Sequence, residues 1–347
     1  MGKVLVIFTG GTIASGFLGD RKGPDPSVSR TLQGYVSSFF EKKGVEVVCL
    51  EPWGIPGLDS SNLDPGHWIE MARIIERSVS EGTDGVLILH GTDTMAHSAA
   101  WLSLCFSGVG IPIILTGSQL TLDYTPEDVT VNLRGAAQVV CSDLTGVWIY
   151  CNWKLVQGNR AHKARAQHPD AFIPIGGLPL YFSPEWARDG EITDLPHPRG
   201  RMPYSLKKIL GTSPEEARKA GKSVRWLLCA PGTDPVPSGN EKIIGLLGFG
   251  AGNAPTSILE KIASFYPDKE KPQIIACSQA EGDVKDPAAY HDVGIAGLSS
   301  RGFDVWGQMD YPVEFIHALC CYSLMASPQD PGKVLGKFLK KYQVRVL

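Results

Sequence analysis

Apolar strands alternate with amphipathic helices along the first half of the chain. Short apolar runs bounded by turn residues predict buried strands, and a three-to-four-residue repeat predicts a helix with one buried face. Between residues 65 and 82, for example, Trp68, Ala72, Ile75 and Val79 share one helical face. The expected strands are 3–9, 45–50, 85–90, 111–116 and 146–152, and the expected helices are 65–82, one opening at Asp93 and one around 126–143. This alternation predicts a parallel β-sheet covered on both faces.

The alternation stops in a segment rich in proline, glycine and charge, from 184 to about 223. Such breakers are typical of a linker. A second α/β series follows, with strands expected at 224–230, 243–249 and 273–278, a helix at 255–265 and three helical stretches after it. The predicted fold class is therefore α/β with two domains. We expect a larger N-terminal α/β domain (1–190), a linker (191–223) and a smaller C-terminal α/β domain (224–347).

Composition excludes several classes of function. A formal net charge of −3 provides no field for a polyanion, so nucleic acid is not an expected partner. Eight scattered cysteines without a CxxC pair indicate buried thiols in a reducing cytoplasm rather than disulfides or zinc. Neither GxGxxG nor a P-loop lysine follows the first strand, so dinucleotide binding is weakly supported. No cofactor and no metal are expected.

A membrane location is also not expected. The longest uncharged stretch, 98–122, is interrupted by Gly108, Gly110, Pro112 and Gly117. The N-terminus runs directly into the first strand without the layout of a signal peptide. These features predict a cytoplasmic protein.

Two polar turns follow parallel strands of the predicted sheet. The first strand ends in Thr9-Gly10-Gly11-Thr12, and the strand 85–90 ends in His90-Gly91-Thr92-Asp93-Thr94. Taken singly, the first is as compatible with a tight turn as with a site, and Asp93 reads better as a helix cap. Because ligands bind outside the carboxyl ends of such strands, the convergence of both turns favours a site.

A third segment, 158–165, holds four basic or potentially basic residues within six positions. Such a cluster is usually a solvated face, and the residues alone do not single out Lys163.

Together, these segments resemble the type I, cytoplasmic bacterial branch of the L-asparaginase family. The resemblance covers nearly the whole chain and rests on landmarks in the family's order: TGGTIA at 9–14, DSSN at 59–62, HGTDT at 90–94, TGSQ at 116–119, GNR at 158–160 with Lys163, and GAGNAP at 250–255. Each short motif is weak evidence alone, whereas the ordered set is specific.

The resemblance implies hydrolysis of L-asparagine to L-aspartate and ammonia through an acyl-enzyme on Thr12. Thr92, Asp93 and Lys163 would form a hydrogen-bonded catalytic group across the scissile amide. Burial would favour the neutral amine of Lys163, whereas a nearby Asp93 would favour the ammonium form. The sequence does not decide between these two effects. The resemblance also implies a homodimer or homotetramer, in which Asn253 could reach a neighbouring subunit. A structural role of Asn253 in its own turn is at least as compatible with the sequence.

The resemblance also implies how a small amino-acid substrate would be held. Asp93 would contact the α-ammonium and Ser60 the α-carboxylate. At the position of Ser61 some relatives have glutamine. Serine at this position is common in the type I branch. Backbone N–H groups at Gly11 and at Gly91–Thr92 would bind the oxyanion.

One departure from the family concerns the loop after the nucleophile. Relatives usually carry a tyrosine there, whereas residues 17–28 contain none. Tyr35, in an expected helix, and Tyr124, in another loop, would each have to enter the site by a different route from the family tyrosine. Either another group activates Thr12, or turnover with asparagine is slow, or the substrate differs.

Two alternatives remain. One is a same-fold amidase acting on a different or larger amide, such as the archaeal tRNA-dependent amidotransferase subunit. That subunit usually has an extra N-terminal domain, for which the chain is expected to have no room ahead of Thr9. The other is a non-catalytic amino-acid-binding homologue, supported by the missing tyrosine.

Overall fold

The computed structural model describes residues 2–18, 20–182, 206–267, 270–280 and 294–342. The chain divides into two compact units, Met1–Leu210 and Gly211–Leu347. The segment expected as a linker spans this division, and its part up to residue 205 lies outside the described residues. The remainder contains α6 (Leu206–Gly211) and α7 (Pro214–Lys222), the latter opened by a capping box between Ser213 and Glu216.

The first unit is built on a seven-stranded sheet in the order β11-β8-β7-β6-β5-β1-β4. Its strands are β1 (Lys3–Phe8), β4 (Glu46–Leu50), β5 (Gly85–Leu89), β6 (Pro112–Thr116), β7 (Gly146–Cys151), β8 (Lys154–Gln157) and β11 (Leu180–Tyr181). The five strands predicted from the sequence are parallel neighbours, which confirms the parallel sheet. The short strands β8 and β11 extend one edge in antiparallel fashion and were not predicted.

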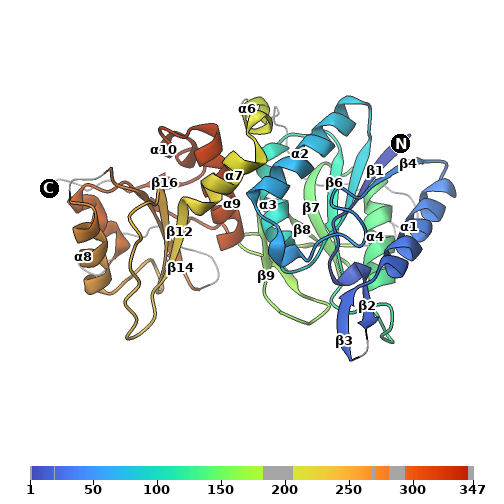
Figure 1. Ribbon diagram of the computed structural model, residues 1–347, viewed down its shortest axis with the longest axis horizontal. Helices are drawn as coiled ribbons and strands as arrows, with labels where there is room; N and C mark the ends of the chain where they lie inside the picture. The colour runs from blue at the N-terminus through green and yellow to red at the C-terminus, as the bar shows by residue number, and fades with distance from the viewer. Residues whose placement is uncertain (1, 19, 183–205, 268–269, 281–293, 343–347) are drawn as a thin grey trace. The chain divides into compact units, whose positions relative to one another are not determined.

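Helices cover both faces of this sheet, as the alternation predicted (Figure 1). They are α1 (Pro26–Glu41), α2 (Pro65–Ser80), α3 (Met95–Cys105) and α4 (Val129–Val140). On one face, α1 and α4 bury Leu32, Val36 and Leu133 in one apolar cluster with the strands. On the other, α2 packs on α3, with the rings of Trp68 and Trp101 stacked at 5.7 Å.

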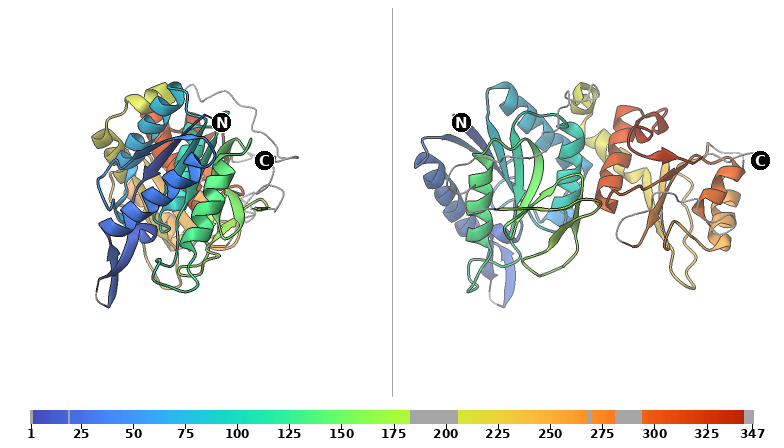
Figure 2. Two further views of the ribbon diagram at one scale, coloured as in Figure 1. Left: turned by 90° about the vertical axis from the view of Figure 1, so that its right-hand side faces the viewer. Right: turned by 180° about the vertical axis from the view of Figure 1, so that it is seen from behind.

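The segment 17–28, taken from the sequence as a loop, is regular instead. It contributes to an antiparallel hairpin of β2 (Ser15–Leu18) and β3 (Arg21–Pro24), and α1 already begins at Pro26. Asp25 caps α1 by accepting a hydrogen bond from the Ser27 N–H at 2.7 Å. The hairpin, in dark blue, projects from the end of the first unit in all views (Figures 1 and 2).

The second unit contains a five-stranded sheet in the order β12-β13-β14-β15-β16. Its strands are β12 (Val224–Leu228), β13 (Ile243–Gly248), β14 (Gln273–Ser278), β15 (Val305–Gly307) and β16 (Lys340–Lys341), and its remaining helices are α8 (Thr256–Phe265), η3 (Ile295–Arg301), α9 (Val313–Ala326) and α10 (Gly332–Leu335). The three predicted strands and α8 are confirmed, whereas the short β15 and β16 were not predicted. Within the described ranges of both units, no helix has the length and apolar character needed to cross a membrane.

Candidate active site

The strand order creates a switch point between β1 and β5. The chain leaves β1 through α1 to reach β4 on one side, and returns through α2 to β5 on the other side of β1. In open α/β sheets ligands bind outside the carboxyl ends of the strands at such a point. The turns that follow β1 and β5 therefore flank the expected crevice.

Glycine lets these two turns touch. Gly11 has a φ of 91°, and a Cβ at this position would overlap the Cα of Gly91. A Cβ on Gly91 would lie 2.6 Å from Ser60 Oγ. Side chains are therefore excluded at both positions, and the residues that follow, Thr12 and Thr92, are brought to one junction.

The turn after β4 closes the same junction. The Leu58 N–H donates to the Thr9 carbonyl at 2.8 Å, and the Thr94 hydroxyl donates to the Ser60 carbonyl at 2.7 Å. Ser60 begins the short helix η2 (Ser60–Asn62) and is buried, with its Oγ against Gly91. Ser60 thus lies where a substrate group at the junction would meet a hydroxyl.

Ser61 is arranged differently from its neighbour. It is exposed, and its N–H and hydroxyl donate to the Asp59 carboxylate at 2.8 and 2.7 Å. The bond from the Ser61 hydroxyl, followed by that from its N–H, holds the pKa of Asp59 below its usual value. The contacts of Ser61 are those of a turn residue.

Lys163 joins the group through its side chain. It ends β9 (Ala161–Lys163), and its Nζ lies 2.9 Å from Thr92 Oγ1 and 2.6 Å from Asp93 Oδ1. The lysine side chain is 12% exposed, whereas that of Asp93 is 67% exposed. Because α3 begins at Met95 after Thr94 as its N-cap, the interpretation of Asp93 as a helix cap is wrong.

The turn after β6 adds a buried amide. Gln119 Oε1 lies 3.5 Å from Thr92 Oγ1, and Gln119 Nε2 is buried without a hydrogen-bond partner among the described residues. The turn is fixed by α4, because the Gln119 N–H donates to Asp128 at 3.0 Å and Asn132 Nδ2 donates to the Gly117 carbonyl at 2.9 Å. TGSQ is a family landmark in the sequence, but no role for Gln119 could be predicted from it.

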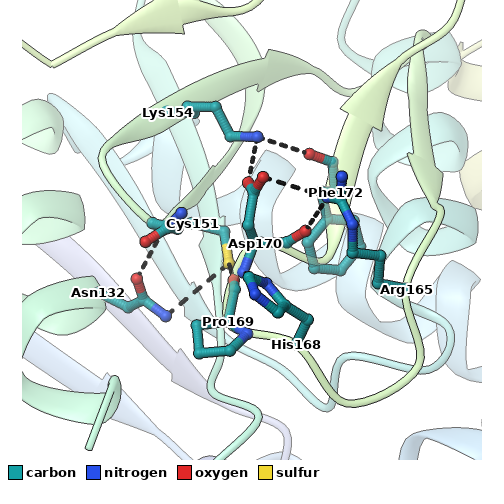
Figure 3. Close-up of polar contacts among 9 residues, drawn as sticks. Asn132, Cys151, Lys154, Arg165, His168, Pro169, Asp170 and Phe172 are labelled. Atoms are coloured by element: carbon teal, nitrogen blue, oxygen red, sulfur yellow. Dashed lines mark hydrogen bonds and ion pairs between the residues drawn. The ribbon is translucent and has the colours of Figure 1, made fainter. Parts of the chain in front are cut away.

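An ion pair between the buried Lys154 and the partly buried Asp170 holds the hairpin that carries Lys163 (Figure 3). Phe172, on β10 (Phe172–Pro174), pairs in register with Lys163. Lys154 of β8 donates to the Phe172 carbonyl at 3.2 Å and forms an ion pair with Asp170, whose Oδ2 also accepts from Arg165 at 3.1 Å. Burial raises the pKa of Asp170, but the hydrogen bond and charge of Lys154 outweigh it and hold the pKa below its usual value. The strand opposite Lys163 is therefore anchored to the main sheet.

His90 is a structural residue of the second turn. It is fully buried, with Nδ1 2.7 Å from the Gly91 carbonyl and Nε2 2.8 Å from Ser98 Oγ. Since a carbonyl only accepts, Nδ1 carries the proton and Nε2 accepts from Ser98. Burial lowers the pKa of His90 from 6.5 to about 4.

The pKa of His90 predicts acid sensitivity of the fold. The unfolded histidine binds a proton below pH 6.5 and the folded one only near pH 4, so the free energy of unfolding falls as pH drops through this window. The loss is expected to reach about 2–3 kcal/mol at pH 4.5. Urea unfolding at pH 7 and pH 4.5 measures it, and His90→Gln should lose less on acidification than the wild type. An equal loss in both proteins would contradict the assignment.

The two tyrosines considered as substitutes, Tyr35 and Tyr124, have contacts of their own in the first unit. Tyr35 is on α1, and its hydroxyl accepts a hydrogen bond from Arg134 Nε of α4. Tyr124 is exposed in the loop between β6 and α4, where its N–H donates to the Thr121 carbonyl at 3.1 Å. Neither of these contacts links a tyrosine to Thr12. The group that takes the place of the family tyrosine is therefore not identified by them.

Asn253 has the contacts of a turn residue in the second unit. It exchanges two backbone hydrogen bonds with Phe249, at 2.7 and 2.8 Å. The family resemblance would also allow Asp283 or Asp286 to act as an acid at the site of a neighbouring subunit, but both residues lie outside the described residues. Among the residues that the structure describes, no group of His, Cys, Asp or Glu side chains is arranged to hold a metal ion.

The fold is that of the two-domain asparaginases. The L-asparaginase structure from Thermococcus kodakarensis superposes with a TM-score of 0.74 at 24% identity, covering 96% of this chain and 95% of that one. Residues 3–183 match the family model described as Asparaginase, N-terminal. The chain therefore belongs to the asparaginase family, which confirms the resemblance found in the sequence.

Curated relatives carry two kinds of name. A glutamyl-tRNA(Gln) amidotransferase subunit of Methanosarcina mazei is 30% identical over 298 residues, covering 82% of this chain and 66% of that protein. L-asparaginase 1 of Escherichia coli K12 is 33% identical over 203 residues, covering 58% and 59%. The chain spans about a third to two thirds of the length of the curated relatives it matches.

Proposed function

We propose that the protein hydrolyses L-asparagine to L-aspartate and ammonia through an acyl-enzyme on Thr12. The observation that carries the proposal is the contact of the mostly buried Lys163 side chain, through Nζ, with Thr92 and Asp93, at the junction where the Gly11 and Gly91 turns touch. A threonine hydroxyl needs an adjacent proton acceptor to act as a nucleophile. Lys163, bonded to Thr92, is the group proposed for that role.

The proposed reaction has two balanced steps. In the first step, Thr12 Oγ1 attacks the side-chain amide carbon and its proton passes to Lys163, to which the Thr92 hydroxyl is hydrogen-bonded. The same proton then goes to the leaving nitrogen, and ammonia departs as the ester forms. Water then attacks the ester, gives its proton to Lys163, and Thr12 regains a proton as aspartate leaves. Backbone N–H groups at Gly11 and Gly91 would stabilise the oxyanion in both steps.

Substrate binding is proposed to change the partner of Asp93. Its exposed carboxylate can accept the α-ammonium of the amino acid, which would weaken its ion pair with Lys163. Ser60, buried against Gly91, would bind the α-carboxylate. Ser61 would also help to bind the substrate, once its hydrogen bonds to Asp59 are broken.

A second candidate is suggested by the relatives named as amidotransferase subunits. The match to the Methanosarcina mazei protein covers more of this chain than the match to the Escherichia coli asparaginase. The same catalytic group could hydrolyse the amide of glutamine or of a larger molecule, together with a partner protein. The proposed cytoplasmic location and homo-oligomeric state belong to the first candidate.

An ammonia assay with the full chain separates these candidates. Purified protein is incubated with asparagine, glutamine and a short series of other amides, and ammonia is followed over time. Turnover of asparagine above the other amides is expected. Turnover of glutamine or other amides alone would favour the second candidate. A thermal shift with asparagine but no ammonia from any amide would indicate a non-catalytic binding protein.

Loosening the Lys163 hairpin is expected to slow turnover without weakening substrate binding. Lys154→Met removes both the ion pair with Asp170 and the bond to the Phe172 carbonyl. Because small misplacement of a reacting group is costly, kcat should fall roughly 10²-fold at nearly constant KM. Lys154→Arg keeps the charge and should restore most of kcat. A wild-type kcat in Lys154→Met would show that Lys163 does not depend on this anchor.

A further inference from the structure

A cavity of about 570 Å³ lies in the first unit, between α1, α4 and the turn that joins β7 to β8. Its size is within the range of small-molecule sites in proteins. Its lining includes Tyr35, Phe39, Arg134, Tyr150, Trp153 and Phe182. None of its lining residues belongs to the candidate active site, so the cavity is a separate feature.

The walls of the cavity are mainly aromatic. The Phe182 ring lies 5.8 Å from the Tyr150 ring in an edge-on arrangement and 5.8 Å from the Trp153 ring. Tyr35 and Phe39 line it from α1. Such surfaces bind flat apolar groups, because ring faces and edges offer large contact areas with little loss of side-chain freedom.

The charge at the cavity is positive. Lys42 and Arg134 are among its lining residues, and no lining residue in the described part of the chain is acidic. The Arg134 guanidinium lies 5.3 Å from the centre of the Tyr35 ring, and its Nε donates to the Tyr35 hydroxyl. The cation is therefore held in place. Although the protein carries a formal net charge of −3, this site is positive and suits an anionic group.

An unusual turn presents one of the rings. Cys151 pairs with Lys154, so Asn152 and Trp153 form a two-residue hairpin turn with φ values of 49° and 62°. Glycine is favoured at the second position, and a bulky residue there is a conformational outlier. Trp153 nevertheless stands there with 53% of its surface exposed at the cavity. Strained residues are retained where their side chains have a use.

We propose that this cavity binds a planar aromatic molecule bearing a carboxylate. The ring lies among Trp153, Phe182 and Phe39, and the carboxylate contacts Arg134 and Lys42. The inference does not depend on the proposed function, because it involves none of the residues assigned to amide hydrolysis.

The test uses the full chain with 1-naphthoate as the probe and 1-naphthylmethanol as its neutral match. Isothermal titration should show saturable, one-to-one binding of the acid, at least about tenfold tighter than the alcohol. Arg134→Gln should remove this preference. Arg77→Gln, which removes an exposed arginine from α2, should leave it unchanged. Trp153→Gly should weaken binding of both probes while the melting temperature stays equal or rises, since glycine accepts the positive φ.

Three results would overturn the proposal. They are no saturable naphthoate binding, equal binding by Arg134→Gln and the wild type, and displacement of naphthoate by asparagine or aspartate. Displacement would locate the probe in the candidate active site rather than in this cavity. None of these results bears on whether the protein hydrolyses asparagine.

Discussion

Ammonia release from asparagine should disappear when Thr12 is replaced by alanine. Removing the nucleophile of an acyl-transfer enzyme typically lowers kcat by roughly 10⁴-fold or more. The fold should be unaffected, because the same turn buries Ile13 and Ala14 while Thr12 itself is only half-buried. Measuring ammonia at saturating asparagine, with circular dichroism and thermal melting as folding controls, tests the prediction.

Thr12→Ser is the matched control, because it keeps the hydroxyl and loses one methyl group. It should retain measurable turnover and, with rapid quenching, carry one aspartyl group on the protein by mass spectrometry. Ammonia release by Thr12→Ala at a rate near that of the wild type would end the assignment of Thr12. The nucleophile would then have to be sought among the other hydroxyls of the junction, beginning with Thr92.

The sheet and its polar edge could be predicted because they depend on local patterns. Buried parallel strands appear as short apolar runs, and β1 and β5 each end in a glycine-containing polar turn. Parallel strands align their carboxyl ends, so the convergence of the Thr12 and Thr92 turns follows from the sequence alone. The close approach of Gly11 and Gly91 shows how tight that convergence is.

The contacts of Lys163 could not be predicted in this way. Its strand, β9, has three residues and belongs to a separate two-stranded sheet. Its position depends on Lys154, which is nine residues earlier, and on Asp170, which follows a long turn. No periodic pattern links such residues, and only the family resemblance singled out Lys163. The same applies to Trp153, because a hairpin turn without glycine does not have the usual sequence of one.

The second large effect is expected from Lys163→Met. Methionine keeps the length of the stem but removes the amine that contacts Thr92 Oγ1 and Asp93 Oδ1. If Lys163 accepts the Thr12 proton, kcat should fall roughly 10²–10⁴-fold, the range for a positioned general base. The fold should persist, because the partner left behind, Asp93, is mostly exposed and can be hydrated.

Lys163→Arg distinguishes proton transfer from charge. Arginine retains the positive charge beside Asp93 but does not release a proton in proteins, so it should be nearly as inactive as methionine if the neutral amine is required. Substantial activity of Lys163→Arg would instead assign the lysine to electrostatic stabilisation. The proton acceptor would then have to lie elsewhere, at the position that the missing loop tyrosine leaves open.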